Sequence, residues 1–398
     1  MKPATSVRPL AALGVLLAVS LLPRLATLRQ VTLPSGEITY YHLEGDELVF
    51  RTLVEQVQGS FFNYSLRGTP LLAQLNKQNY DLPIFFHPPA FVYTTVLLGF
   101  LPVPLVPVLM NLGTVALVFF IARRLYDDER ALWAAFLAAV CPVMWFLSQK
   151  IWLDNMVILT TTASVAAALW AAEQGREWAY AVAGAVLGLA ILTKVTAVLI
   201  CLPVAAFLWQ RDAGGITLSK AAAFVLPAAL LAGWWELTLH AFNNQWLPSA
   251  FPNPEMIAQF PFVAAIVARP WYFYLVNLIA TTPIYLLALD ALRRRQPRDL
   301  ALGLWFIAFW GAMTIFGLQG GGYQTRYISP GYPALALLAA EPIPRLKTAG
   351  LLVVMALVGY GMCNALLYAV LQTPTLADYQ GSVAWVVVRT LREIPVLH

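Results

Sequence analysis

Long apolar segments separated by short polar links fill most of this 398-residue chain. Lys2 and Arg8 precede the first segment, and Arg24 and Arg29 follow it without a small-x-small cleavage site, so we interpret it as a retained helix and not a signal peptide. The segments are 9–23, 104–122, 131–149, 155–172, 179–193, 195–209, 221–240, 271–291, 299–318, 328–341 and 349–371. Several are shorter than the roughly 20 residues of a straight crossing, and together they predict about eleven transmembrane helices.

The composition agrees with this pattern. The chain is 60% hydrophobic and 11% charged, with a mean hydropathy of +0.69, which is typical of an all-α polytopic membrane protein. Its net charge of +5 comes mainly from the polar links, so it bears on topology and does not indicate nucleic-acid binding. The three cysteines lie in apolar segments as small core residues, and the chain has no CxxC, Walker or glycine-rich nucleotide motif.

The distribution of basic residues predicts the orientation in the membrane. If the N-terminus is cytoplasmic, every inner link carries cations, as the positive-inside bias requires. These cations are Arg123, Arg124, Arg130, Arg176, Arg211, Lys220, Arg293, Arg294, Arg295, Arg298, Arg345 and Lys347. The same assignment requires that the proline-rich segment 83–101 does not cross the membrane but forms a short helix along the outer interface or dips in and returns.

With this topology the first outer segment covers residues 25–103, much more than a connection needs. Residues 46–57 within it have apolar side chains at helical spacing and predict an amphipathic interfacial helix. Three carboxylates, Glu44, Asp46 and Glu47, lie close to its start, where the helix dipole favours negative charge. The alternative is an acidic loop that is simply solvated beside the membrane.

Ionisable groups on the predicted outer side come from the ends of several apolar segments. They are Glu44, Asp46, Glu47, His87, Lys150, Asp154, Lys194, Glu236, His240, Arg269 and Arg326. A helical bundle can gather such groups in one cavity at the membrane boundary. There, a carboxylate can accept a proton from a hydroxyl while cations neutralise a phosphate leaving group. An ion-pair network without chemistry would place similar residues there, so both interpretations stay open at this point.

Five short motifs follow one another along the chain: the Asp46-Glu47 pair, HPPAFVYTTVLLGF, SQKIWLDNM, GAVLGLAILTKVTAVLICLP and QTRYISPGYPALALLAA. In this order they resemble the GT-C fold glycosyltransferases of the protein O-mannosyltransferase and lipid A aminoarabinose transferase superfamily. The likeness covers most of residues 1–345. It implies an enzyme that moves a sugar from a polyprenyl-phosphate carrier to an acceptor hydroxyl on the extracytoplasmic face, typically with inversion at the anomeric carbon.

The resemblance implies roles for the acids. Asp46 corresponds to the catalytic acid of the first loop, with Glu47 as its neighbour, and Asp154 corresponds to the acid of the second loop. We expect Asp46 to act as the general base. Asp154 could orient that base, bind the acceptor, or hold a divalent cation with Glu47 or His87, so a divalent metal is a possible cofactor that these ligands do not identify.

The resemblance also implies contacts to the donor phosphate. Lys194 corresponds to the basic residue after the glycine-rich helix, and Arg326 and Tyr327 to the Arg-Tyr of the late motif. This chain has His87-Pro88-Pro89 where the lipid A enzymes have Lys-Pro-Pro, which leaves a weaker, titratable cation at this contact. That difference places the chain nearer the mannosyltransferase-like branch, in which histidine occurs there.

We therefore predict a membrane-embedded glycosyltransferase domain over residues 1–372, with the catalytic acids in outer loop 25–103, a second large outer loop at 241–270 and a short extracytoplasmic tail at 373–398. Its partners would be a polyprenyl-phosphate-linked sugar, a lipid, glycan or protein acceptor, and the bilayer. The Ala/Leu/Arg-rich composition indicates a bacterial plasma membrane protein of the cell envelope with an outward-facing site. The alternative function is a transporter or lipid flippase that binds its substrate with the outer charged cluster.

Overall fold

The chain forms two compact units, each assembled from separate stretches of sequence. The first unit comprises Met1–Thr27, Asn111–Gln149 and Ile257–His398, and the second comprises Leu28–Met110 and Lys150–Met256. The computed structural model describes residues 7–28, 30–32, 38–40, 45–75, 80–244, 246, 267–371 and 382–384. Most of the predicted outer loop 241–270 and of the tail 373–398 therefore lies outside the described residues.

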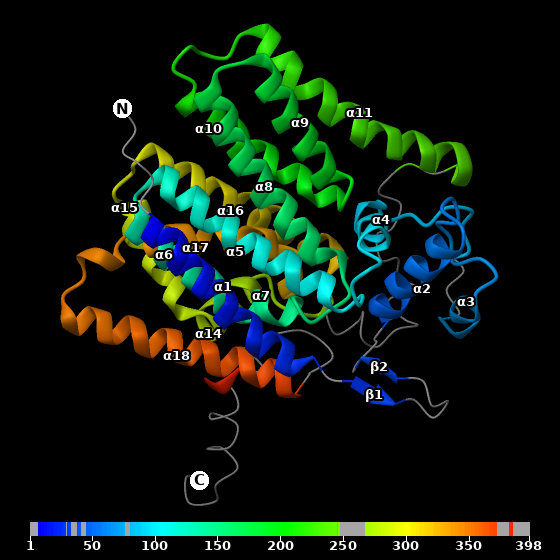
Figure 1. The fold of residues 1–398 in the computed structure, drawn as a ribbon, viewed down its shortest axis with the longest axis horizontal. Coiled ribbons are helices and arrows are strands. Elements are labelled where there is room, and N and C mark those ends of the chain that lie inside the picture. The colour runs from blue at the N-terminus through cyan, green and yellow to red at the C-terminus, as the bar shows by residue number, and fades with distance from the viewer. Residues whose placement is uncertain are drawn as a thin grey trace, which may run out of the picture. The chain divides into compact units, whose positions relative to one another are not determined.

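The described part of the first unit is helical (Figure 1). Its elements are α1 (Val7–Thr27), most of α5 (Leu105–Leu125), α6 (Asp128–Ala139), α7 (Pro142–Leu147), α14 (Phe273–Thr281), η3 (Pro283–Leu287), α15 (Ala288–Arg293), α16 (Pro297–Phe316), the π-turn η4 (Gly317–Gly321), η5 (Thr325–Gly331), α17 (Tyr332–Ala340), η6 (Ile343–Arg345) and α18 (Thr348–Leu371). Helix α17 is the centre of this unit, because all nine of its residues are buried and α6, α15 and α16 pack against it. Its alanines allow these helices to approach closely.

Arg24 anchors α1 to the rest of the first unit. Its guanidinium is fully buried and donates at 2.9 Å to Asn111 Oδ1 and at 2.8 Å to the carbonyl of Ala139. Ala139 is the last residue of α6, where backbone carbonyls have no intrahelical partner and the helix dipole is negative. The helix end thus stabilises a cation that would otherwise be costly in a membrane span.

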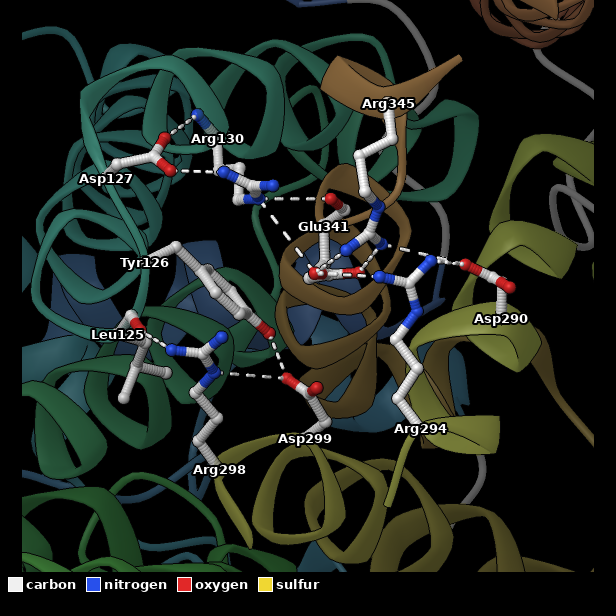
Figure 2. Close-up of polar contacts among 10 residues, drawn as sticks. All are labelled: Leu125, Tyr126, Asp127, Arg130, Asp290, Arg294, Arg298, Asp299, Glu341 and Arg345. Carbon is white, nitrogen blue, oxygen red and sulfur yellow. Dashed lines mark hydrogen bonds and ion pairs between the residues drawn. The ribbon is translucent and has the colours of Figure 1, made fainter. Parts of the chain in front are cut away.

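Basic links of the first unit meet in a network of carboxylates and guanidinium groups, which we call the arginine network (Figure 2). At its centre the buried side chain of Glu341 accepts from Arg345 at 2.7 Å and lies 3.8 Å from Arg294 and 4.0 Å from Arg130. Asp290 accepts from Arg294 at 2.7 Å and lies 3.7 Å from Arg345. The network joins the start of α6, the end of α15 and the turn after α17.

A second buried carboxylate extends this network (Figure 2). Asp299, in the first turn of α16, accepts a 2.6 Å hydrogen bond from the hydroxyl of Tyr126 and lies 3.9 Å from Arg298. Arg298 in turn donates at 2.7 Å to the carbonyl of Leu125 at the end of α5. The links after α5, after α15 and after α17 are therefore at one end of the first unit, as the predicted common side of their basic residues requires.

The second unit combines two short strands and several short helices with longer helices (Figure 1). Its elements are β1 (Gln30–Thr32), β2 (Ile38–Tyr40), α2 (Gly45–Gly59), α3 (Pro70–Leu75), α4 (Ala90–Leu97), α8 (Leu153–Gln174), α9 (Glu177–Ile191), η2 (Val195–Ile200), α10 (Cys201–Arg211) and α11 (Leu218–Asn243). The strands pair antiparallel, with Val31 opposite Thr39. Helices α9 and α10 pack against α8, and α11 packs against α9.

Two glycines explain how closely α9 and α11 approach. A Cβ added at Gly184 would lie 1.9 Å from the carbonyl oxygen of Phe224, and one added at Gly188 would lie 2.9 Å from Cβ of Leu231. Their four-residue spacing is the small-xxx-small pattern of membrane helix pairs. Because most of α11 is exposed in the unit, this glycine face is its main attachment.

Each predicted apolar segment corresponds to a helix or to a broken helix. Six helices are long and apolar enough to span a membrane, or seven if α14 and the helix after it, bent by 106°, count as one span, among the described residues. The segments 179–193 and 195–209 correspond to shorter helices, and 131–149 is broken between α6 and α7. Pro142 explains that break, because proline lacks an N–H for the preceding turn.

The helix predicted over residues 46–57 and the short helix predicted within 83–101 are both present, and their location at the outer interface stays a prediction. Helix α2 is amphipathic and buries Val49, Phe50, Leu53, Val54 and Val57 while Glu55 is exposed. The segment 83–101 contains the single helix α4, of eight residues. Since a helix rises about 1.5 Å per residue and a bilayer core is about 30 Å thick, α4 is too short to cross.

Candidate active site

The acidic pair predicted to carry the chemistry occupies the first turn of α2. Asp46 is half-buried, and Glu47 is 2% exposed. Backbone N–H groups at a helix N-terminus and the helix dipole both favour the ionised form of a carboxylate there. The apolar face of α2 packs on α4, and this contact holds α2 in place within the second unit.

Glu47 is held by the segment that leads into α8. Its Oε2 atom lies 3.1 Å from Nζ of Lys150, and its Oε1 atom accepts a 3.0 Å hydrogen bond from the backbone N–H of Ile151. The side chains of Glu47 and Lys150 are 3% and 4% exposed, so this ion pair is almost completely removed from solvent. Removing either partner of such a buried ion pair strongly destabilises the folded protein.

The second predicted acid forms a separate pair. Asp154, in the first turn of α8, accepts a 2.8 Å hydrogen bond from Nζ of Lys194, the residue that precedes η2. The Asp154 side chain is 2% exposed, whereas that of Lys194 is 19% exposed. The lysine is therefore the member of this pair that reaches the surface.

His87 lies on the neighbouring HPP segment. Its ring is 6.0 Å from that of Phe50 on α2 and 4.4 Å from that of Phe86, and its carbonyl accepts a 3.0 Å hydrogen bond from Tyr64. Burial raises the pKa of the Tyr64 hydroxyl well above its ordinary value, with a smaller contribution from Tyr93, so Tyr64 remains a neutral donor.

Backbone contacts complete the cluster. The N–H of Ala90, directly after the HPP segment, donates at 3.2 Å to the carbonyl of Leu192, two residues before Lys194. Hydrogen bonds thus link α2 to the start of α8, the start of α8 to Lys194, and the 192–194 turn to the HPP segment, whose rings in turn pack on α2. Five of the seven site residues predicted from sequence therefore gather in one region of the second unit: Asp46, Glu47, His87, Asp154 and Lys194.

Arg326 and Tyr327 belong to the first unit, in η5. The Nε atom of Arg326 donates at 2.7 Å to Oε1 of Gln324, and its guanidinium carbon lies 5.8 Å from the centre of the Tyr327 ring. The Tyr327 ring packs edge-on against Phe316 at 6.1 Å. Their predicted contact with a donor phosphate stays a prediction.

Lys150 is the residue of this region that sequence reasoning did not assign to the site. In the sequence Lys150 was only one of several ionisable groups on the predicted outer side. Its position in the SQKIWLDNM motif does not reveal that its partner is Glu47, 103 residues earlier. The available signal was its spacing of four residues from Asp154, which puts both near the start of one helix.

The predicted metal ligands do not form a metal centre of their own. In the part of the chain that the structure describes, no group of three or more His, Cys, Asp or Glu side chains is arranged to hold a metal ion. Both Glu47 and Asp154 instead have lysine partners. Glu44 lies outside the described residues.

Known proteins match this chain in sequence. Residues 87–236 match the family model described as dolichyl-phosphate-mannose-protein mannosyltransferase. The chain is 33% identical over 268 residues to an undecaprenyl phosphate-alpha-4-amino-4-deoxy-L-arabinose arabinosyl transferase of Pseudomonas paraeruginosa, a match that covers 63% of this chain and 47% of the relative. The chain therefore spans about half the length of the curated relatives it matches.

Solved structures match it in fold. The apo crystal structure of ArnT from Cupriavidus metallidurans superposes with a TM-score of 0.62, at 18% identity, over 89% of this chain and 63% of that one. The chain has a GT-C fold. The same protein bound to undecaprenyl phosphate superposes with a TM-score of 0.61, at 18% identity, over 92% of this chain and 70% of that one. The predicted helical, multi-pass GT-C architecture is confirmed, with the short β1–β2 pair as an element that was not predicted. The predicted count of about eleven spans is not, since six or seven helices of the described residues are long enough to cross.

Proposed function

We propose that this protein is a glycosyltransferase that moves a sugar from a polyprenyl-phosphate carrier to an acceptor hydroxyl. The observation that carries the proposal is the gathering of Asp46, Asp154 and Lys194 beside the HPP segment, from four stretches of a GT-C fold. The names of the matching relatives support a polyprenyl-phosphate donor carrying a pentose or hexose. No feature of the described residues favours the transporter alternative over this one.

Asp46 is the general base of the proposed reaction. As the acceptor oxygen bonds to the anomeric carbon, its proton passes to the Asp46 carboxylate, and the bond from that carbon to the phosphate oxygen breaks with its electron pair on the polyprenyl phosphate. Attack from the face opposite the phosphate inverts the anomeric carbon. The first turn of α2 supports this role, because the helix dipole keeps Asp46 ionised and ready to accept a proton.

Lys194 neutralises charge on the leaving phosphate. It has the exposure that this task needs, since its side chain reaches the surface while its partner Asp154 is buried. Polyprenyl phosphate leaves readily once its charge is matched, so the proposed reaction requires no general acid. Asp154 orients Lys194 in this scheme, His87 contributes a titratable donor beside it, and Arg326 remains the motif-based candidate for a further phosphate contact.

The direct test is a transfer assay. Purified protein is incubated with undecaprenyl phosphate carrying radiolabelled sugars, one sugar at a time, in the presence of bacterial envelope lipids and glycans. Release of free undecaprenyl phosphate with transfer of label to an acceptor is the expected result. Absence of release with every donor, while the folded protein binds undecaprenyl phosphate, would count against the glycosyltransferase and in favour of a lipid-binding function.

We further propose that the site faces outward from a bacterial plasma membrane. The cationic links gathered in the arginine network support this orientation through the positive-inside bias. In a background without the three native cysteines, Phe62→Cys should react with an impermeant thiol reagent in intact cells, since Phe62 is 89% exposed and follows α2. Arg293→Cys, exposed in the inner link, should react only after cell lysis. The reverse pattern overturns the orientation.

A further inference from the structure

We infer that Glu47 and Lys150 act together as a positioning clamp that sets Asp46 in place. This inference rests on the proposed function and concerns the same site. In the clamp, Glu47 is neither a base nor a phosphate ligand. It joins the turn of α2 that carries Asp46 to the turn that opens α8 and carries Asp154.

Burial separates the clamp from the residues that can meet substrate. The Lys150 side chain is 4% exposed and that of Glu47 3%, whereas that of Lys194 is 19% exposed and Asp46 is half-buried. A polyprenyl phosphate must approach from the membrane boundary, so it can contact Lys194 but not a lysine enclosed by the protein. Lys150 is instead 5.7 Å from the centre of the Trp152 ring, a contact internal to its own turn.

Hydrogen bonds of the backbone around Lys150 connect the clamp to the turn that carries Asp154. The Lys150 carbonyl accepts at 2.8 Å from the N–H of Trp152 and at 3.3 Å from Nδ2 of Asn155. The same turn donates the Ile151 N–H to Glu47. Asp154 is therefore held in a turn whose position is set at one end by Glu47 and at the other by its own helix. Removing the clamp frees the start of α2 to move relative to Asp154.

A buried ion pair suits such a task better than it suits stabilisation. Desolvating two charges offsets most of their attraction, so the net gain over an apolar pair is small, while the best-attested use of such pairs is to fix one register among several. Here the ion pair would fix the position of the Asp46 side chain. A misplacement of about 1 Å in a reacting group can lower turnover about 10²-fold.

Three variants separate positioning from chemistry. Glu47→Gln keeps an acceptor for the Ile151 N–H but removes the negative charge 3.1 Å from the buried Lys150 cation, and Lys150→Met removes that cation from the buried Glu47 carboxylate. The double variant removes both charges and keeps the backbone hydrogen bond. We expect each single variant to lose about 10²-fold in kcat. The double variant should recover at least about tenfold over either one, as coupling within a pair requires.

The readouts are chosen so that a loss of stability alone does not reproduce them. The change should fall on kcat with KM for the donor nearly constant, because Lys194 is untouched. The acid limb of the pH–rate profile should be retained in the double variant, since Asp46 still titrates. As a matched control, the exposed pair Arg67–Asp81 of the same unit is treated identically with Arg67→Gln and Asp81→Asn, and should show neither a loss of turnover nor coupling.

The results decide between three cases. If Glu47→Gln and the double variant are equally inactive, Glu47 takes part in the chemistry and the clamp is overturned. If the parent protein itself does not transfer sugar, the proposed function fails, and the clamp is judged by thiol labelling of Asp46→Cys in a background without the native cysteines. Faster labelling in both single variants, with a slow rate restored in the double variant, supports the clamp. Equal rates in all backgrounds refute it.

Discussion

Buried acids are matched differently in the two units. In the second unit Glu47, Asp154 and Asp212 form ion pairs with Lys150, Lys194 and Lys220, at 3.1, 2.8 and 2.6 Å. In the first unit Glu341 lies within 4.0 Å of three arginines, two of which also contact Asp290. Lysine is a point charge, whereas the planar guanidinium can bind several oxygens at once, which suits the arginines to a shared network.

This difference predicts two kinds of behaviour. In a lysine pair a short contact between two buried or half-buried side chains balances the acid's charge, so each member strongly affects the other. The arginine network retains other contacts when one member is removed, which suits a scaffold that holds helix ends together (Figure 2). We therefore place chemistry and its positioning at the lysine pairs, and structural support at the arginine network.

The largest effect is expected from the acid next to the lysine pairs. Asp46→Asn keeps the size of the side chain but removes the base, so kcat for sugar transfer should fall on the order of 10²–10⁴-fold with donor binding preserved. Asp290→Asn in the arginine network and Glu55→Gln, an exposed acid on the same helix as Asp46, should transfer at nearly the parent rate. Equal losses in Asp46→Asn and Asp290→Asn would erase the functional contrast between the two regions.

A second prediction compares stability. Lys150→Met removes the cation 3.1 Å from the buried carboxylate of Glu47 and should cost about 3–5 kcal/mol. Arg130→Met removes contacts to Asp127 and Glu341, but Glu341 keeps Arg294 and Arg345, so the cost should be about 1 kcal/mol or less. Thermal unfolding of the purified variants in detergent gives the ranking. A lower midpoint for Arg130→Met than for Lys150→Met would show that the network is the more fragile of the two.

The smallest expected effect is a difference in how Asp212 and Glu341 make the stability of the fold depend on pH. Burial alone would raise the pKa of Asp212, but hydrogen bonds from Lys220, Tyr180 and the Gly214 N–H outweigh it and lower the pKa below 3.8. Burial raises the pKa of Glu341 above 4.5, although Arg294 and Arg130 oppose the shift. Ionised Asp212 therefore stabilises the fold at and above pH 3.8, and this contribution is lost as the pH falls through its folded pKa.

For Glu341 the sign is reversed. The folded state holds the Glu341 proton more tightly than the unfolded state, so its contribution to stability falls as the pH rises from 4.5 through the raised pKa. Unfolding midpoints measured from pH 3 to 7 for the parent, Asp212→Asn and Glu341→Gln test this. The advantage of the parent over Asp212→Asn should shrink toward acid pH, and the parent should lose stability relative to Glu341→Gln as the pH rises toward neutral. Parallel curves for both variants would contradict the assigned shifts.

Much of this protein follows from local sequence. Apolar runs and basic links predicted the multi-pass helical architecture, and helical spacing over residues 46–57 predicted α2 with Asp46 and Glu47 in its first turn. The prolines of 83–101 predicted a segment that does not cross. These features depend on periodicity, propensity and charge within a few residues of one another, which a single sequence displays directly.

Tertiary structure decided which residues meet. The segment 131–149 was predicted as one span, but the structure breaks it before Pro142, and the Ala139 carbonyl at that break binds Arg24 only because α1 packs beside α6. Likewise Glu47 and Asp154 were both predicted as members of one acidic site, yet packing gives Glu47 to Lys150 and Asp154 to Lys194. A sequence shows which charges are present. Their pairing across 103 and 40 residues depends on burial, because only in a desolvated interior must each carboxylate have a particular partner.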